Sequence, residues 1–334
     1  MNNGLKIAAF TAALAAAFGA AYGVGNGVDP VSAEPARHGG HEDGGDGGEG
    51  RDRQAGHQSP AAGPDPKAPA DLPGGLQVAE GGYRLDLETR TAKADERGPL
   101  RFRVLDQQGR SVTAYKEEHG KELHLILASR DLNTYRHLHP TRADDGTWSI
   151  RTKLPRAGDY RLFADFTPKV KGAENLTLGA DLAVVGDYRP KALPKPDRTA
   201  RTEGYTVTLD GGLRAGESGK LSLKVSKDGR PVTDLEPYLG AYGHLVALRN
   251  ADLAYLHVHP DGEIGDDSVR PGPEVSFSAT APSEGSYRLF LDFKHEGKVR
   301  TAAFTVTAGG AGAPSEGKTG SEAERPAEGG EHQH

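Results

Sequence analysis

The chain contains the stretch His124-Leu-Ile-Leu-Ala-Ser-Arg-Asp-Leu-Asn-Thr-Tyr-Arg-His137-Leu-His139-Pro140 and, later, the related stretch His244-Leu-Val-Ala-Leu-Arg-Asn-Ala-Asp-Leu-Ala-Tyr-Leu-His257-Val-His259-Pro260. In both copies the first histidine precedes the His-x-His-Pro by the same step, since 137 − 124 and 257 − 244 both equal 13. A tyrosine, Tyr135 or Tyr255, occupies the same place in each copy. This spacing indicates an internal repeat, and therefore a duplicated structural unit.

A second pair of matching phrases follows the first. Gly158-Asp-Tyr-Arg-Leu-Phe-Ala-Asp165-Phe resembles Gly285-Ser-Tyr-Arg-Leu-Phe-Leu-Asp292-Phe. The offset of 127 (285 − 158) exceeds the 120 (244 − 124) that relates the histidines, so the extra residues belong to the loop between the two phrases. Each unit spans about 105 to 115 residues, enough for a domain with its own core. The sequence therefore predicts two related domains.

The overall composition agrees with two modest domains and polar tails. The 334 residues are 26% charged and 35% hydrophobic, with 46 Gly and 22 Pro. The chain has no Cys, which excludes disulfides, thiolate metal sites, cysteine nucleophiles and lipid anchoring through an N-terminal Cys. A net charge of −6 gives no reason to expect a nucleic-acid partner.

Short segments with alternating or β-branched residues run through both units, separated by Gly, Pro and Asp clusters. In the first unit they cover 83–88, 100–105, 122–127, 148–154 and 159–166. Strands of this length with frequent turn signals are typical of an antiparallel β-sandwich. Ser286 to Lys294 and Lys298 to Thr307 bracket a short His-Glu-Gly loop, which predicts a closing β-hairpin. The predicted fold class is all-β, with two tandem antiparallel sandwiches.

These patterns divide the chain into six predicted parts: a signal peptide or signal anchor (1–33), a disordered His/Gly/Asp-rich linker (34–75), a first sandwich (76–188), a Pro/Lys-rich linker (189–202), a second sandwich (203–308) and a disordered tail (309–334). Histidines in the two disordered parts either collect metal weakly or belong to solvated spacers.

The N-terminus predicts export. Lys6 precedes an Ala-rich apolar run from Ile7 to Val24, and Val31-Ser32-Ala33 offers small residues for a signal peptidase. The run reaches roughly 27 Å as a helix, which nearly matches a bilayer core of ~30 Å. Cleaved signal peptide and uncleaved membrane anchor both remain open; a buried Ala-rich helix is disfavoured because nothing amphipathic adjoins it.

The repeated histidines predict one divalent metal site in each unit. Strand alternation places Tyr135, His137 and His139 on one face, with Arg136 and Leu138 on the other. The candidate ligands are His124, His137, His139 and Asp165 in the first unit, and His244, His257, His259 and Asp292 in the second. Imidazole and carboxylate suit Zn(II) or Cu(II). The absence of Cys and the single Met1 exclude blue-copper and Met-rich Cu(I) sites.

A structural role for these histidines is the alternative interpretation. Histidines at the start of one strand and the end of another can hydrogen-bond backbone groups at a sandwich corner, and duplication would copy that pattern. His119 and His295 are assigned outside the sites, because Leu239 and Pro168 take their places in the other repeat. No serine-hydrolase elbow, zinc-protease helix or phosphate-binding loop is present, so we predict no enzyme; a hydrolytic zinc with an open position is the one catalytic possibility.

The phrases around His124, His137-Leu-His139-Pro and Gly285-Ser-Tyr-Arg-Leu-Phe resemble those of exported tandem β-sandwich proteins of high-GC bacteria, which are mostly uncharacterised, and are loosely similar to the YtkA-like and CopC-like copper-handling families. The resemblance covers Leu76 to about Ala308 and implies an immunoglobulin-like or cupredoxin-like fold. It also implies an extracytoplasmic, non-enzymatic metal-binding role. We therefore expect a membrane-tethered or secreted protein that buffers or delivers Cu(II) or Zn(II). The alternative is a metal-free envelope module that binds a protein or glycan.

Overall fold

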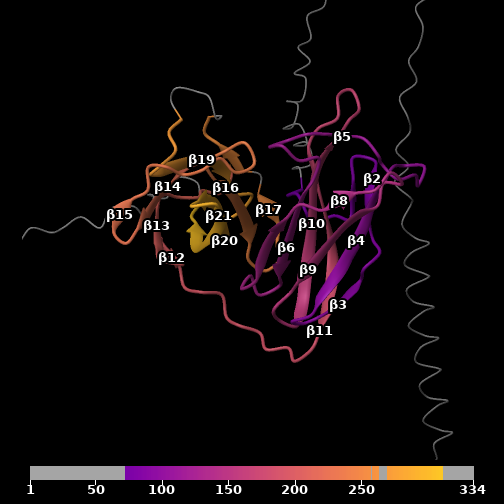
Figure 1. Ribbon diagram of the computed structural model, residues 1–334, viewed down its shortest axis with the longest axis horizontal. Coiled ribbons are helices and arrows are strands. Elements are labelled where there is room, and N and C mark those ends of the chain that lie inside the picture. The colour runs from indigo at the N-terminus through magenta and orange to yellow at the C-terminus, as the bar shows by residue number, and fades with distance from the viewer. Residues whose placement is uncertain (1–71, 257, 263–268, 311–334) are drawn as a thin grey trace, which may run out of the picture. The chain divides into compact units, whose positions relative to one another are not determined.

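The computed structural model describes residues 72–256, 258–262 and 269–310, without the side chain of His259. The described residues belong to one compact unit, Lys67–His334. All their regular elements are strands, which confirms the all-β fold class (Figure 1). None of these residues forms a helix that is long and apolar enough to cross a membrane. The predicted segment 1–33, residues 34–71 of the first linker and residues 311–334 of the tail lie outside the described residues.

The first sandwich consists of two sheets. One sheet has the order β1 (Ala79–Glu80), β2 (Tyr83–Leu87), β4 (Arg97–Leu105), β9 (Trp148–Lys153) and β8 (Thr141–Arg142). The other has the order β3 (Thr91–Lys93), β11 (Leu176–Val185), β10 (Gly158–Pro168), β6 (His124–Ser129) and β7 (Tyr135–Leu138), with β5 (Tyr115–Lys116) paired to β10. All neighbours are antiparallel except β3 and β11, which run parallel.

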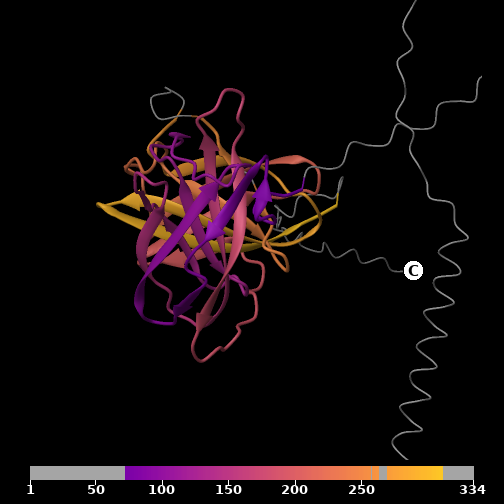
Figure 2. The same cartoon turned by 90° about the vertical axis from the view of Figure 1, so that its right-hand side faces the viewer.

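The second sandwich repeats this plan. Its first sheet has the order β12 (Thr199–Thr202), β13 (Tyr205–Gly211), β14 (Ser218–Lys227), β19 (Glu274–Thr280) and β18 (Val258–Pro260), with β15 (Arg230–Pro231) paired to β14. Its second sheet has the order β17 (Tyr255–Leu256), β16 (His244–Arg249), β20 (Gly285–His295) and β21 (Lys298–Ala308). Figure 2 shows β20 and β21 as the long yellow pair at the end of the chain.

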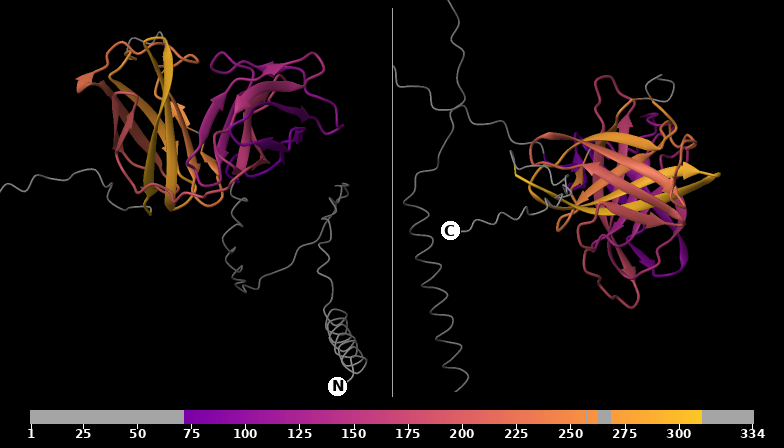
Figure 3. Two further views of the ribbon diagram at one scale, coloured as in Figure 1. Left: turned by 60° about the horizontal axis from the view of Figure 1, so that its bottom comes forward. Right: turned by 90° about the vertical axis from the view of Figure 1, so that its left-hand side faces the viewer.

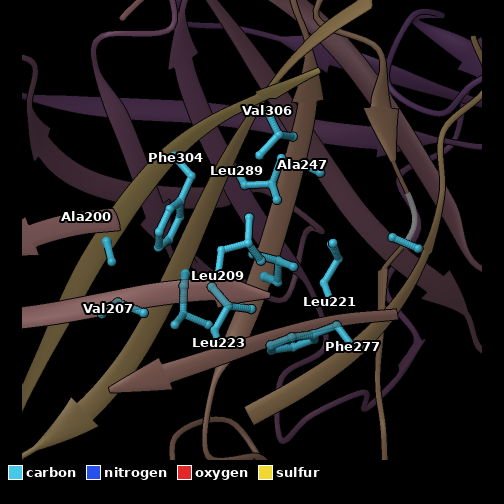
Figure 4. Packing of buried hydrophobic residues seen from close by; sticks show 14 of the residues in the cluster. Ala200, Val207, Leu209, Leu221, Leu223, Ala247, Phe277, Leu289, Phe304 and Val306 are labelled. Atoms are coloured by element: carbon cyan, nitrogen blue, oxygen red, sulfur yellow. The ribbon is translucent and has the colours of Figure 1, made fainter. Parts of the chain in front are cut away.

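Each sandwich has its own apolar core between its two sheets. Phe102, Leu125 and Leu162 are fully buried in the first core. In the second core Val207, Leu223 and Phe277 come from one sheet and face Leu289 and Phe304 from the other (Figure 4). The alternation along the strands predicts this arrangement, because every second side chain points between the sheets.

The closing hairpin is confirmed and is slightly longer than predicted. β20 and β21 pair from Gly285↔Ala308 to His295↔Lys298, so the loop is only Glu296-Gly297 (Figure 3). Both loop residues have positive φ, 52° and 70°, as a two-residue turn that matches strand twist requires. One segment differs: the last four residues of the predicted linker form β12, which pairs with β13.

The central strands β6 and β16 are buried on both faces. In β6, Leu125 and Leu127 enter the first core, whereas Ile126 and Ala128 join a third apolar cluster. In β16 the residues that join this third cluster are Val246 and Leu248. The docking cluster, as we call it, contains buried residues of both repeats: Ile126, Ala128, Leu132, Tyr135, Phe163, Val246, Leu248, Leu253 and Phe290. The two repeats therefore pack against each other through the outward faces of these sheets.

Candidate functional site

Three of the predicted ligands form one cluster. One potential ligand atom from each of His124, His137 and His139 lies within 4.8 Å of the other two. His124 begins β6 and His137 lies in the neighbouring β7, where it pairs with Ile126 one residue along from His124. His139 follows directly after the end of β7. Strand pairing therefore brings together imidazoles that are thirteen residues apart in the chain, since 137 − 124 = 13.

The imidazoles of His124 and His137 belong to a continuous chain of hydrogen bonds. His124 Nε2 lies 3.1 Å from the carbonyl oxygen of Glu118, and His124 Nδ1 lies 3.1 Å from His137 Nε2. His137 Nδ1 lies 3.0 Å from Asp292 Oδ2. Each end of this chain is a hydrogen-bond acceptor. The outer nitrogen of each ring is therefore oriented as a donor, and the two inner nitrogens face each other.

Counting protons shows what this arrangement lacks. The contacts to Glu118 and Asp292 and the contact between the rings together take three N–H groups. Two neutral imidazoles supply only two. The position between His124 Nδ1 and His137 Nε2 therefore suits a third proton or, in its place, a cation bound by both nitrogens. Whether the ring or the carboxyl carries that proton does not change the count.

Asp292 is a buried carboxylate with three donors. Besides the contact with His137, its Oδ2 accepts from the Tyr135 hydroxyl at 3.1 Å, and its Oδ1 accepts from the Thr301 hydroxyl at 2.5 Å. Its side chain is 3% exposed and that of His137 is 5% exposed. Three donors to one carboxyl group favour its ionised form. The sequence pairs Asp292 with the histidines of its own repeat, whereas the structure places its carboxylate on a histidine of the other repeat.

His139 supplies the third nitrogen and has no partner for it. Its Nε2 is buried without a hydrogen bond among the described residues. Its ring centroid lies 5.4 Å from that of His124 and 4.9 Å from that of His137. A buried polar atom without a partner costs roughly 1–3 kcal/mol, so such atoms are uncommon outside functional sites. The orphan nitrogen points to a missing ligand.

Burial keeps several of these imidazoles neutral. It lowers the pKa of His124 to about 4, with a further contribution from His137. Burial likewise lowers the pKa values of His139 and His244 to about 3. Neutral imidazole is the form that coordinates a metal ion, so these rings are available as ligands at neutral pH.

Two further histidines adjoin the cluster. His244 Nε2 lies 3.0 Å from the carbonyl oxygen of Leu239, which mirrors the contact of His124 with Glu118. The ring of His244 lies 6.1 Å from that of His124, and the exposed ring of His119 lies 5.1 Å from that of His244. The sequence argument assigned His119 outside the site, and this is wrong in position: a residue without a repeat partner can still approach when the two repeats pack together. His295 lies apart, bonded to Tyr205 and Asp234.

Asp165 occupies the place in the first repeat that Asp292 has in the second. Each is the register partner of the first histidine of its repeat, His124 or His244. Asp165 accepts hydrogen bonds from Asn175 at 2.7 Å and from the Tyr255 hydroxyl at 3.5 Å. A tyrosine of each repeat thus donates to the aspartate of the other, which is the signature of a quasi-twofold arrangement.

The second predicted site is described only in part. His257 and the side chain of His259 lie outside the described residues. The backbone shows one difference from prediction: Tyr255–Leu256 belong to β17 in one sheet, and Val258–Pro260 belong to β18 in the other. A single strand parity from Tyr255 to His259 therefore does not apply. A cavity of about 460 Å³ adjoins both repeats and is lined by residues that include His119, His124, His137 and His244.

No curated protein matches this sequence. Solved structures that resemble the chain include three from bacterial surface proteins. The D0-D1 domain of intimin has 11% identity, 67% of this chain and 96% of that chain covered, and a TM-score of 0.20. InvD of Yersinia pseudotuberculosis has 12% identity, coverages of 69% and 58%, and a TM-score of 0.22. Domains 4 and 5 of the S-layer protein SbsC have 14% identity, coverages of 70% and 98%, and a TM-score of 0.20.

These names fit the alternative interpretation, an envelope interaction module, better than they fit copper handling, and none of them shows the similarity to copper proteins. Identities and scores this low carry no argument about function. The tandem immunoglobulin-like sandwich is the level at which the resemblance holds. A family model matches each repeat separately, at residues 77–177 and 200–310, and the chain belongs to that family, described as "Domain of unknown function (DUF8832)".

Proposed function

We propose that this protein binds one divalent transition-metal ion, Cu(II) or Zn(II), through His124, His137 and His139. Three imidazoles with potential ligand atoms within 4.8 Å of one another carry the proposal. The accompanying role is buffering or delivery of the metal by an exported, non-enzymatic protein of the cell envelope. Export rests on the apolar run Ile7 to Val24, and delivery on the loose resemblance to copper-handling families.

The donor set suits the proposed ions. Imidazole nitrogen is a ligand of intermediate softness that both Zn(II) and Cu(II) accept. Two nitrogens bound to one tetrahedral zinc at ~2.0–2.1 Å lie about 3.3–3.4 Å apart. His124 Nδ1 and His137 Nε2 are already 3.1 Å apart. Only a small adjustment separates the hydrogen-bonded pair from a pair of ligands.

The outer contacts of the cluster also support metal binding. Ligating imidazoles in proteins commonly donate their other N–H to a carbonyl or a carboxylate, which orients the ring and raises its basicity. His124 has the carbonyl of Glu118 in this position and His137 has the carboxylate of Asp292. For the second repeat, a metal site at His244, His257, His259 and either aspartate stays a prediction from the sequence.

The metal-free envelope module remains the competing function. In that case the histidines are structural, and their hydrogen bonds stabilise the packing between the repeats. The unpartnered Nε2 of His139 speaks against this explanation, because a structural histidine normally has its buried nitrogens satisfied. The two functions therefore differ at one side chain.

Isothermal titration of Cu(II) and Zn(II) tests the proposal. The full-length chain should carry alanine at the five histidines near its ends, His38, His41, His57, His332 and His334. We expect micromolar or tighter binding at neutral pH, and a loss of roughly 100-fold or more in His139→Ala. The metal-free stability of His139→Ala should be unchanged or higher, because the variant removes a buried nitrogen without a partner.

His295→Ala is the matched control. His295 is buried and bonds to Tyr205 at 2.7 Å and Asp234 at 3.1 Å, away from the cluster. This variant should keep the metal affinity of the parent and lose stability. A parent that binds neither ion, or a His139→Ala variant that binds as tightly as the parent, would contradict the proposal.

A further inference from the structure

The site proposed above is not contained in one repeat. We infer that metal binding and docking of the two sandwiches are coupled, with Asp292 of the second repeat as the positioning residue for His137 of the first. The inference rests on the proposed metal site and adds its regulation: the ion binds tightly only when the repeats are packed together, and the bound ion stabilises that packing.

The first observation is the buried pair that crosses between the repeats. Asp292 and His137 are 3.0 Å apart, and their side chains are 3% and 5% exposed. Thr301 on β21 and Tyr135 on β7 hold the carboxylate from both sides. A carboxylate fixed in this way sets the orientation of the imidazole and increases the basicity of its other nitrogen, His137 Nε2. That nitrogen is one of the three proposed ligands.

The second observation is the docking cluster that surrounds this pair. The ring of Phe290 stacks on that of Tyr135, with centroids 4.1 Å apart and an angle of 6° between the planes. Phe290 and Asp292 alternate on the same face of β20, so the apolar contact and the carboxylate reach the first repeat together. Separation of the repeats would therefore remove the orienting carboxylate from His137 at the same time as it exposes apolar surface.

Thermodynamic linkage makes the coupling reciprocal. If docking raises metal affinity by some factor, bound metal must favour docking by the same factor. The segment that joins the repeats offers a readout. Lys191 N donates to Asp131 Oδ2 at 3.0 Å, and Leu193 packs against the docking cluster. The peptide bond Lys191–Ala192 should therefore become more accessible to trypsin when the repeats separate, whereas prolines follow Arg189 and Lys195 and block cleavage there.

Two substitutions in the full-length chain without its terminal histidines test the coupling. Asp292→Asn removes the charge and leaves all proposed ligands in place, and Phe290→Ala weakens docking without touching a ligand. We expect each to lower Zn(II) affinity by roughly tenfold or more. Asp234→Asn is the matched control, because it changes a second His–Asp pair, at 3.1 Å from His295, that lies outside the cluster. It should bind Zn(II) as the parent does.

Tryptic cleavage at Lys191 gives the second readout. In Phe290→Ala, cleavage should be severalfold faster than in the parent, and saturating Zn(II) should reverse much of that increase. Equal affinity in the parent, Asp292→Asn and Phe290→Ala, or cleavage that does not respond to Zn(II), would overturn the coupling while the metal site stands. A parent that binds no Zn(II) and no Cu(II) would overturn both.

Discussion

Buried imidazoles make the stability of the metal-free protein depend on pH. Burial lowers the pKa of His244 to about 3, whereas an unfolded chain has an imidazole pKa near 6.5. Between these values the unfolded state binds more protons, so stability is fully present above pH ~6.5 and falls as the pH drops toward ~3. His244→Gln should flatten this fall by an amount of the order of 1–3 kcal/mol between pH ~6.5 and ~4.

Urea unfolding at several pH values, in the presence of a chelator, measures this effect. Val185→Ala is a suitable control, because Val185 is 53% exposed and lies in β11, away from the cluster. Its stability curve should run parallel to that of the parent at every pH. If the His244→Gln curve also ran parallel to the parent, the burial of His244 would not be a source of acid sensitivity.

Residue-level prediction succeeded where spacing within one repeat decides the contact. The register between β6 and β7 follows from a short loop, so His124 and His137 meet as their spacing indicates. The partner of His137 could not be predicted in this way, because Asp292 comes from the other repeat. His119 was missed for the same reason: its neighbour His244 becomes apparent only when the repeats are packed together.

At the scale of elements, one short segment closes the gap between a sheet and the docking cluster. Gly75 N donates to Thr177 O at 2.7 Å, and Tyr255 N donates to Gly74 O at 2.9 Å, so residues 74–75 contact both repeats. A Cβ at Gly179, in β11, would lie only 2.0 Å from Gly75 O. Gly179→Ala should therefore displace this segment and destabilise the protein by about 1–3 kcal/mol, measured by thermal or urea unfolding.

Gly98→Ala supplies the comparison for Gly179→Ala. Gly98 lies in β4, and a Cβ there would meet no atom within 4 Å. Its effect should stay within about 0.5 kcal/mol, as for most exposed substitutions. Equal stabilities of the two variants would show that the segment can move aside at no cost.

The elements themselves were largely predictable, and their environment was only partly so. Alternation indicates which side of β20 faces the core, since Leu289 and Leu291 are buried there. It also assigns Phe290 and Asp292 to the opposite side, which the sequence analysis regarded as outward. That side is buried against the other repeat. The signal for this was present in β6 and β16, where four consecutive apolar residues, 125–128 and 245–248, indicate strands buried on both faces.

At the scale of the whole molecule, duplication accounts for the shape of the interface. The same positions of each repeat meet the other repeat: Tyr135 packs on Phe290, and Tyr255 lies 5.7 Å from Phe163 between ring centroids. An interface in which each partner contributes the same patch is the arrangement found in twofold dimers. The two repeats therefore behave as a dimer within one chain. Sequence comparison shows the duplication but not which face the copies share.

This shared interface should make the two sandwiches unfold together. The docking cluster buries residues of both repeats around Phe290, so neither sandwich keeps its environment when the other unfolds. We expect one calorimetric transition for the parent. Phe290→Asp places an unpaired carboxylate in this cluster and should separate the transition into two, because burying a charge without a partner costs several kcal/mol. Val299→Asp, at a β21 position that is 37% exposed, should keep a single transition. Two transitions in the parent, or one in Phe290→Asp, would show that the sandwiches do not depend on each other, because the docking cluster would then contribute no cooperativity.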